Sequence, residues 1–292
     1  MISQSLATKV ASPRKTRSLR IAHLTDMHVQ PEQRAQEGYL AALESVSRLD
    51  PAPDFLITGG DHVMDATAQT LGRCRVQWDL YNKSIAQVKI PVHPILGNHD
   101  IFGWGLAEVS ESTVGYGKAM ALDRLKLERT YYSFDASGWK FILLDSMTRR
   151  GRTYLGELGP EQTEWLRGEL AAAGRMPVAV FSHIPILSAC VFFDGQERLG
   201  ADAWHVPDAW MHRDMRELVG LFAQHNTRLL VSGHIHLVDR LEYRNMTFLC
   251  DGAVCGDWWK GPCQQFGEGY GVIDLYPDGR FNHQYVTFGW KA

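Results

Sequence analysis

The stretch LLVSGHIH (residues 229–236) decides the fold of this 292-residue chain. An apolar run, residues 229–231, is followed by Gly233 and by two histidines, His234 and His236. Short apolar runs of this kind are typical of strands that are buried on both faces in an α/β protein. Ligands of open α/β sheets bind beyond the carboxyl ends of the strands. The stretch therefore predicts a buried strand with a functional site at its carboxyl end.

The same pattern, an apolar run that ends in Asp, Asn or His, occurs in four further stretches. They are HLTDMHV (23–29), LITGGDHVMD (56–65), ILGNHD (95–100) and VFSHIP (180–185). Because the ends of such strands share one edge of a sheet, the polar residues are expected to converge on one crevice. The five stretches supply Asp26, His28, Asp61, Asn98, His99, Asp100, His183, His234 and His236.

Helical patterns separate these runs, and the C-terminal part of the chain differs from the rest. Residues 39–49, 159–174 and 215–225 have the patterns of helices, and Pro160 stands at the first position of the second one. Residues 246–288 have the pattern of strands joined by the turn YPDGR. Strands that alternate with helices and end in an antiparallel part predict an α/β fold with helices outside and sheet inside.

A single domain, residues 19–292, is predicted to follow a disordered lead-in, residues 1–18. No internal repeat or low-complexity tract interrupts this domain. Two less regular stretches, 101–132 and 184–210, are rich in Gly and aromatic residues and are expected to be loops. Loops of that length are usually functional.

The composition is that of an ordinary globular protein, with 45% hydrophobic residues and a formal net charge of −3. This near-neutral charge gives no reason to expect a nucleic-acid polymer as a partner. No apolar run approaches the roughly 20 residues that cross a bilayer, so no membrane span is expected. The basic N-terminal segment lacks the apolar core of a secretory signal, which predicts a cytoplasmic protein and leaves a trimmed export signal as the alternative. The oligomeric state stays open.

The five cysteines are an odd number, and none forms a C-x-x-C pair. Reduced thiols are therefore expected, and a zinc–thiolate site is not. A disulfide between Cys250 and either Cys255 or Cys263 is the alternative.

The polar residues at the strand ends are a ligand set for metal ions, because imidazole with carboxylate suits iron, manganese or zinc. In D-x-H and H-x-H, the two donors would lie on one side of an extended segment, since side chains alternate with period two. Glycines before Asp61, Asn98 and His234 allow close approach of the backbone. The donors at the strand ends are too many for one tetrahedral ion. They fit two ions with a shared ligand, typically about 3.5–4 Å apart.

The motifs D-x-H, G-D, G-N-H-D, a single His and G-H-x-H, in this order, resemble those of the calcineurin-like metallophosphoesterase superfamily. The spacing resembles its bacterial phosphodiesterase-like branch. The resemblance implies a four-layer α/β/β/α sandwich with two central mixed sheets and a dimetal site at the C-terminal ends of the strands. It implies that Asp26, His28 and His236 hold the first metal, that Asn98, His183 and His234 hold the second, and that Asp61 bridges both.

The resemblance also implies a hydrolase that uses a hydroxide activated by two metal ions, with iron, manganese or zinc expected. The family counterpart of His99 protonates or stabilises the leaving oxygen. The expected substrate is a phosphodiester or phosphomonoester of a small or nucleotide-like molecule, with the diester preferred. A catalytically silent binding module of the same fold is the alternative.

Departures from related families narrow the expected substrate. Ser/Thr protein phosphatases carry G-D-x-V-D-R-G, whereas this chain has GDHVMDA (60–66), with the second Asp one place later and no Arg. A Ser/Thr protein phosphatase is therefore not expected. Met64 stands where purple acid phosphatases have Tyr, so a tyrosine-ligated ferric centre is not expected either. The segment DGAVCGDWWKG (251–261) resembles a Trp-Trp segment that follows G-H-x-H in some bacterial members.

Six further residues are candidates for supporting roles. Asp65 or Asp100 could orient a metal-binding imidazole from outside the ligand set. The candidates for the rim of the substrate pocket are His62, Trp104, Phe192 and Trp258. For each of these four, packing in a loop or in the core is the alternative, because an aromatic ring serves both purposes.

Overall fold

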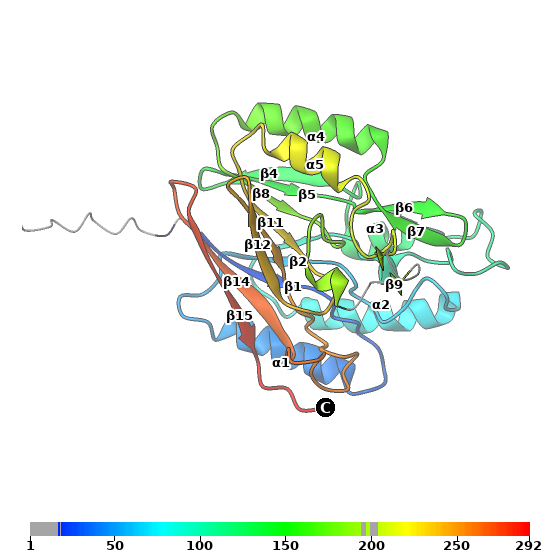
Figure 1. Cartoon of the computed structure of the whole chain (residues 1–292). Coiled ribbons are helices and arrows are strands. Elements are labelled where there is room, and N and C mark those ends of the chain that lie inside the picture. The colour runs from blue at the N-terminus through cyan, green and yellow to red at the C-terminus, as the bar shows by residue number, and fades with distance from the viewer. Residues whose placement is uncertain (1–16, 18, 194–196, 199–203) are drawn as a thin grey trace, which may run out of the picture.

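The computed structural model describes residues 17, 19–193, 197–198 and 204–292 (Figure 1). The predicted lead-in, residues 1–18, lies outside the described residues apart from Arg17. Two β-sheets lie face to face, with α4 and α5 above them in Figure 1 and α1 and α2 below. The predicted four-layer α/β/β/α sandwich is confirmed.

The first sheet is mixed, with five strands in the order β15-β14-β1-β2-β3. β1, β2 and β3 run parallel to one another, whereas β14 is antiparallel to both β1 and β15. The strands of this sheet are β1 Leu19–Leu24, β2 Phe55–Thr58, β3 Val92–Pro94, β14 Gly269–Leu275 and β15 Phe281–Thr287.

The second sheet is also mixed, with six strands in the order β12-β13-β11-β8-β5-β4. The four inner strands are parallel, and the edge strands β12 and β4 are antiparallel to their neighbours. The strands of this sheet are β4 Tyr132–Ala136, β5 Trp139–Leu143, β8 Val178–Phe181, β11 Thr227–Ser232, β12 Asp239–Tyr243 and β13 Met246–Cys250.

The helices lie outside the two sheets, as the sequence pattern predicts. Two short strand pairs and two 3-10 turns, η1 and η2, complete the described chain. The helices are α1 Ala35–Ser47, α2 Leu71–Ile85, α3 Ala119–Leu125, α4 Pro160–Ala173 and α5 Met215–Phe222. The remaining elements are η1 Asn98–Asp100, η2 Cys190–Phe192, β6 Met147–Arg150, β7 Thr153–Gly156, β9 Glu197–Arg198 and β10 Trp204–His205.

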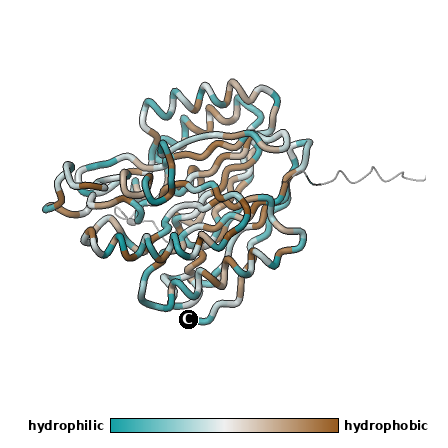
Figure 2. The backbone as a smooth tube through the Cα atoms, turned by 180° about the vertical axis from the view of Figure 1, so that it is seen from behind, coloured by the Kyte–Doolittle hydropathy of each residue, from teal (hydrophilic) through white to brown (hydrophobic). Residues whose placement is uncertain are grey.

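Three apolar cores hold the four layers together, one between each pair of neighbouring layers. In β1, Ile21 belongs to the core between the sheets, and Ala22 belongs to the core that includes Tyr39 of α1. Both faces of the strand are therefore buried, which explains why its sequence is apolar throughout instead of alternating. Figure 2 shows the same division, with hydrophobic central strands and outer helices that alternate between hydrophobic and hydrophilic residues.

The ends of α4 agree with the sequence pattern, whereas one predicted loop does not. Pro160 begins α4, and Gly174 follows its last residue with φ 56°. The stretch 101–132, expected to be a loop, contains α3, a helix too short to show a helical period in the sequence. Part of the other stretch, 184–210, lies outside the described residues.

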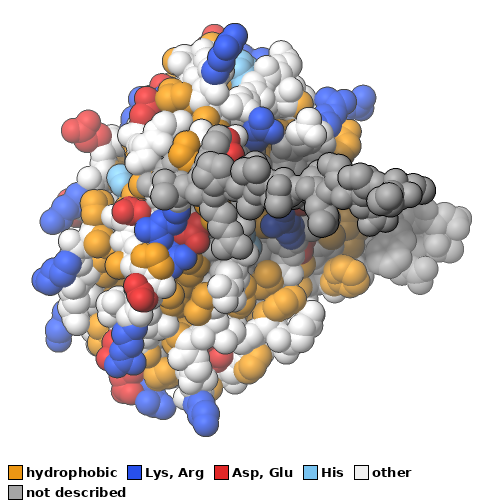
Figure 3. Space-filling model, turned by 90° about the vertical axis from the view of Figure 1, so that its left-hand side faces the viewer, with side chains coloured by type: hydrophobic (Ala, Val, Ile, Leu, Met, Phe, Trp, Pro, Cys, Tyr) orange, Lys and Arg blue, Asp and Glu red, His pale blue; other side chains and the backbone are white. Residues whose placement is uncertain are grey.

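The surface carries charges of both signs. On the face that Figure 3 shows, Lys and Arg side chains lie among Asp and Glu side chains, in keeping with the formal net charge of −3. No helix in the described part of the chain combines the length and the apolarity that a bilayer crossing requires.

Candidate metal centre

The loops that follow the parallel strands meet at the carboxyl ends of both sheets. After β1 and β2, the amide of His28 donates to the carbonyl oxygen of Asp61 at 2.9 Å. After β8 and β11, the amide of Gly233 donates to the carbonyl oxygen of His183 at 3.1 Å. Residues far apart in the sequence are therefore held at one place by backbone hydrogen bonds.

Most of the predicted ligands lie just beyond the strands and not in extended segments. Left-handed backbone conformations occur at Asp26 (φ 56°), His28 (43°), Asp61 (52°), His234 (72°) and His236 (60°). The expectation that period-two alternation aligns the D-x-H and H-x-H pairs is therefore wrong, because tight turns aim these side chains instead. Non-glycine residues in this conformation are strained by about 1–3 kcal/mol and cluster at functional sites.

Two glycines allow these turns to pack closely. A Cβ atom at Gly97 would lie 2.1 Å from the amide nitrogen of Asp61. A Cβ atom at Gly233 would lie 2.0 Å from Oγ1 of Thr25 and 2.4 Å from Oδ2 of Asp26. The glycines of G-N-H-D and G-H-x-H are thus required by contact, as the sequence predicts for positions of close approach.

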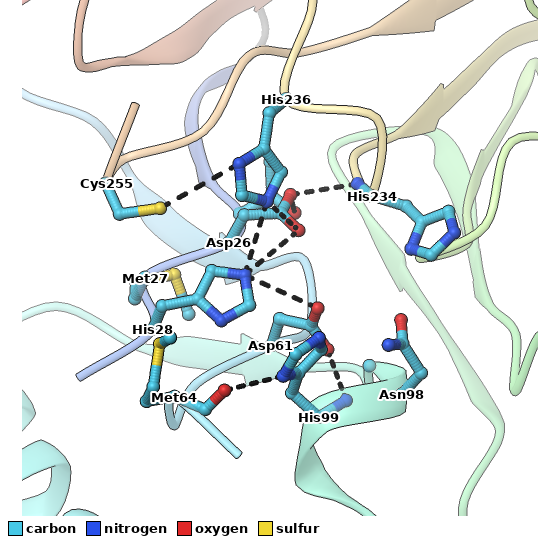
Figure 4. Close-up of polar contacts among 12 residues, drawn as sticks. Asp26, Met27, His28, Asp61, Met64, Asn98, His99, His234, His236 and Cys255 are labelled. Carbon is cyan, nitrogen blue, oxygen red and sulfur yellow. Dashed lines mark hydrogen bonds and ion pairs between the residues drawn. The ribbon is translucent and has the colours of Figure 1, made fainter. Parts of the chain in front are cut away.

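The first group of donors is Asp26, His28 and His236, whose side chains point toward one another (Figure 4). The Nε2 atoms of His28 and His236 are 3.2 Å apart. Oδ1 of Asp26 lies 3.4 Å from Nε2 of His236 and 3.8 Å from Nε2 of His28. This oxygen is buried and accepts no hydrogen bond from the described residues. A buried carboxylate oxygen without a donor, beside two imidazole nitrogens, fits a cation.

The second group is Asn98, His183 and His234. Nε2 of His183 lies 3.0 Å from Oδ1 of Asn98. Nε2 of His234 lies 2.9 Å from the carbonyl oxygen of Ala209, so Nδ1 is the ring nitrogen that could bind a metal ion. Candidate ligand atoms of His183, His234 and Asp61 all lie within 4.8 Å of one another.

Asp61 lies between the two groups. Its Oδ2 atom is 3.5 Å from Nε2 of His28, in the first group, and 3.3 Å from Nε2 of His183, in the second. Its Oδ1 atom accepts a hydrogen bond of 2.8 Å from the amide of His99. One carboxylate oxygen thus faces both groups, which is the place a bridging ligand occupies. The structure brings all seven predicted donors together, and their assignment as metal ligands stays a prediction.

Backbone carbonyls hold the far nitrogens of two further imidazoles, as the carbonyl of Ala209 does for His234. Nδ1 of His183 lies 2.8 Å from the carbonyl oxygen of Gly59, and Nδ1 of His236 lies 2.8 Å from that of Gly256. Because a carbonyl only accepts, each Nδ1 carries a proton, and each Nε2 faces the site. The sequence does not show this arrangement, because backbone groups leave no side-chain signature.

Neither Asp100 nor Asp65 orients a predicted ligand imidazole. Oδ2 of Asp100 lies 2.8 Å from Nδ1 of His62, whose Nε2 lies 2.9 Å from Oγ1 of Thr58. His62 is therefore fully buried and does not line the pocket, contrary to the prediction. Oδ1 of Asp65 accepts from the amides of residues 67 and 68 and stabilises its own loop.

The other predicted rim residues divide between the core and the pocket. Trp104 is only 7% exposed and belongs to the core beneath the first sheet, so its prediction as a rim residue is wrong. Phe192 is about half exposed and is not among the described residues that line the pocket. Trp258 does line it.

The pocket in front of the donors has a volume of about 460 Å³. It contains no Lys or Arg among its described lining residues. Asp257 places a carboxylate at its wall. The lining residues are Asp61, Asn98, His99, Tyr154, Trp210, His234, Ile235, His236, Asp257, Trp258, Cys263 and Gln264.

Aromatic side chains stand on both sides of the donors. The ring of Trp258 lies 4.2 Å from that of His28, and Trp258 has a left-handed φ of 53°. On the other side, Trp210 and Tyr154 lie 6.0 and 6.4 Å from the ring of His234. Sequence reasoning missed Tyr154 and Trp210, although Trp210 ends a stretch that was expected to be functional.

Burial and neighbouring charges set the protonation of the first group. Burial raises the pKa of the Asp26 carboxyl, but the neighbouring His236 outweighs this and lowers the pKa below its usual range. Burial, together with His99, holds the pKa of His28 well below its usual range. Burial lowers the pKa of His236, but Cys255 and Asp26 outweigh it and raise that pKa well above its usual range. A bound cation would displace the His236 proton, because ligands bind metal in their deprotonated forms.

Burial and neighbouring charges also shift the pKa values of Asp61 and of two histidines in the second group. Burial raises the pKa of Asp61, but His183 and His99 lower it well below its usual range. Burial lowers the pKa of His183, but Asp61 raises it to about 9. Burial and the neighbouring His183 lower the pKa of His234 to about 3. A bound cation would displace the proton that His183 and Asp61 share, because ligands bind metal in their deprotonated forms.

The five cysteines form no disulfide with one another, and Cys255 lies beside the site. Its Sγ atom is 4.0 Å from Nδ1 of His236, and it belongs to a possible ligand group with His28 and His236. The spacing of the cysteines gave no signal for this contact. Burial raises the pKa of the Cys255 thiol, which keeps it protonated.

Comparisons with known proteins agree with this geometry. The family model of the calcineurin-like phosphoesterases matches residues 19–238. The serine/threonine-protein phosphatase CPPED1 of Rattus norvegicus is 25% identical over 219 residues, and that of Mus musculus is 26% identical over 220. Each alignment covers 73% of this chain, and this chain spans 63% of the length of these relatives.

Two solved structures share the fold. A dimetal phosphatase from Danio rerio superposes with a TM-score of 0.68 at 13% identity, over 94% of this chain and 97% of that one. GAP50, described as the anchor in the inner membrane complex of Plasmodium, superposes with a TM-score of 0.57 at 14% identity, over 94% and 86%. Because the family model covers most of the sequence, the chain belongs to the calcineurin-like phosphoesterase family.

Proposed function

We propose that this protein is a binuclear metal-dependent phosphoester hydrolase. The observation that carries the proposal is the position of Asp61, one oxygen of which faces a histidine of each donor group at 3.5 and 3.3 Å. Membership of the family supports it. Asp26, His28 and His236 would hold one ion and Asn98, His183 and His234 the other, with iron, manganese and zinc as the candidates for this donor set.

The residues of the chain have distinct parts in the proposed reaction. The chemistry that two such ions supply is activation of water near neutral pH and compensation of phosphoryl charge. The Asp61 carboxylate would bind both ions and so fix the distance between them. His99 lines the pocket, and its Nδ1 atom is fixed by the carbonyl oxygen of Met64 at 2.5 Å. When the ring is protonated on both nitrogens, the other nitrogen can donate its proton to the leaving oxygen.

A phosphodiester of a small or nucleotide-like molecule is the proposed substrate. A diester carries one negative charge, whereas a monoester carries up to two and requires more positive charge around it. The described lining of the pocket has no Lys or Arg and includes Asp257, which favours the less charged ester. Trp258 offers a flat surface for a ring of the substrate.

A phosphoserine or phosphothreonine side chain is the second candidate substrate, because the curated relatives carry the name of serine/threonine-protein phosphatases. The absence of an Arg in GDHVMDA and in the described lining argues against it. A bis-aryl phosphate, a mono-aryl phosphate and a phosphoserine peptide, assayed with each metal in turn, distinguish the two. Faster hydrolysis of the diester supports the first candidate, and faster hydrolysis of the peptide supports the second.

The proposal as a whole is tested by Asp61→Asn, with Asp65→Asn as the matched control. The first variant should lose at least about 100-fold in kcat/KM, because it weakens the ligand that both proposed ions share. The second should keep near-normal activity, because the hydrogen bonds of the Asp65 side chain stay within its own loop. A silent binding module would instead bind metal and hydrolyse none of the three esters.

A further inference from the structure

A second cavity lies at the opposite end of the sandwich from the metal centre. It has a volume of about 540 Å³ and lies between the start of β11, the turn between β12 and β13, and the turn between β14 and β15. Arg228 is the second residue of β11, and His234 lies two residues beyond the end of that strand. At about 3.3 Å per residue the two are roughly 20 Å apart. The end of the molecule with the β14–β15 turn faces the viewer in Figure 3.

Arg228 is a cation of this cavity and forms no ion pair with an Asp or Glu in the described part of the chain. Its Nε atom is buried and has no acceptor among the residues that the structure describes. The side chain lies along the β14–β15 turn, where a Cβ atom at Gly279 would be 3.5 Å from that Nε. No described Asp or Glu lines the cavity. An unsatisfied buried donor is unfavourable. The part of the half-buried Arg228 side chain that lines the cavity is the part that a ligand can reach.

The other basic and polar groups of the cavity are partly engaged. Nε of Arg280 donates to Asp278 at 2.9 Å, and its guanidinium lies over the ring of Tyr276 at 5.4 Å. Nδ2 of Asn282 donates to the hydroxyl of Tyr276 at 3.0 Å. Asn245 and Thr247 complete a lining rich in hydrogen-bond donors.

We propose that this cavity is a binding site for a small molecule that carries a phosphate group, held by Arg228. Guanidinium groups match phosphate oxygens with paired hydrogen bonds, and the surrounding donors suit a group that only accepts. Tyr276 and Phe281 add aromatic surface, and the volume exceeds that of phosphate alone, so the ligand has an organic part. The site is independent of the proposed metal centre.

The test uses the metal-loaded full chain with inorganic phosphate as the probe. Arg228→Met keeps the length of the side chain and removes its charge, and Arg216→Met, on the exposed surface of α5, is the matched control. Calorimetric titration should show a phosphate-binding event that Arg228→Met weakens by about tenfold or more, the effect of losing a charged hydrogen bond. Arg216→Met should bind as the wild type does. Any binding at the metal centre is common to all three proteins, so the difference isolates the cavity.

A second readout guards against misfolding. Without phosphate, Arg228→Met should melt no lower than the wild type, because it removes an unsatisfied buried donor. Added phosphate should raise the melting temperature of the wild type and of Arg216→Met more than that of Arg228→Met, whereas chloride at the same ionic strength should not. Phosphate should also protect Arg228 from phenylglyoxal, as mass spectrometry of the modified chain would show. Equal phosphate binding by the two variants, or no protection of Arg228, overturns the proposal.

Discussion

Nδ1 of His99 lies 2.5 Å from the carbonyl oxygen of Met64, so the predicted catalytic imidazole is oriented by the backbone and not by a carboxylate. The Asp that follows Met64 turns back into its own loop, where it accepts two amide hydrogen bonds. This loop is the place where the sequence departs from the Ser/Thr protein phosphatase pattern. A carbonyl fixes the position of the ring protons but adds no negative charge beside the ring.

His99→Ala should lower kcat by about 10²–10⁴ on an ester with an alkyl leaving group, the usual effect of losing a general acid. The loss should be smaller on a nitrophenyl ester, whose leaving oxygen needs no proton. Bound metal, measured by elemental analysis, should not change. His225→Ala, away from the site, is the control. Equal losses on the two esters would contradict the role as a proton donor, and loss of metal would make His99 a ligand.

Trp258→Leu should reduce kcat/KM for a diester with an aromatic group by about tenfold, which is what loss of one stacking contact causes. The kcat/KM for a dialkyl phosphate should change much less, because an alkyl group does not stack. Trp165→Leu, on α4 and away from the pocket, controls for the loss of a tryptophan. Equal losses on both substrates would show that Trp258 only supports the imidazoles against which it packs.

Gly233→Ala and Gly168→Ala should change stability in opposite directions. A methyl group at Gly233 meets Thr25 at 2.0 Å, whereas one at Gly168 in α4 meets no atom within 4 Å. The first change should lower the free energy of unfolding by about 2–4 kcal/mol. The second should raise it by up to about 1 kcal/mol, since Ala is the better helix former. Urea denaturation of both variants measures this, and a stable Gly233→Ala protein would refute the close packing of the loops.

The buried contacts of Asp251 predict how stability depends on pH. Its two oxygens lie 2.8 Å from Nδ1 of His23 and 2.7 Å from Nε2 of His283. Burial raises the pKa of Asp251, but His283 and His23 outweigh it and lower that pKa below its usual range. Burial lowers the pKa of His283, but Asp251 outweighs it and raises that pKa.

The two shifts act over different pH ranges. The depressed pKa of Asp251 stabilises the fold above about pH 3.9, and that stabilisation is lost as the pH falls further. The raised pKa of His283 stabilises it below about pH 6.5, and that part is lost as the pH rises through the folded-state pKa. The difference in the free energy of unfolding between the wild type and Asp251→Asn should therefore be largest between about pH 3.9 and pH 6.5. Urea denaturation in chelator at several pH values tests this, and a pH-independent difference would contradict it.

Much of the architecture could be predicted from the sequence because burial on both faces leaves a direct record. The apolar runs of β1, β2, β8 and β11 stand where the strands are, and a predicted metal ligand follows each strand within two or three residues. The order of the motifs was sufficient to identify the family. The helix α3 could not be predicted, since seven residues are too few to show a period.

The details of the site could not be predicted for physical reasons. A left-handed turn at Asp26 or His234 depends on contacts between loops that are distant in sequence. The same holds for His62, which looks like a loop residue but is buried by Asp100 and Thr58. Trp210 approaches His234 because the loop before α5 packs against the loop after β11, and no local sequence pattern records this.

Anomalous diffraction from crystals grown with manganese tests the central claim most directly. Two peaks about 3.5–4 Å apart are expected, one among Asp26, His28 and His236 and the other among Asn98, His183 and His234, with Oδ2 of Asp61 between them. Peaks at other side chains, or a single peak that Asp61 does not contact, would contradict the binuclear centre.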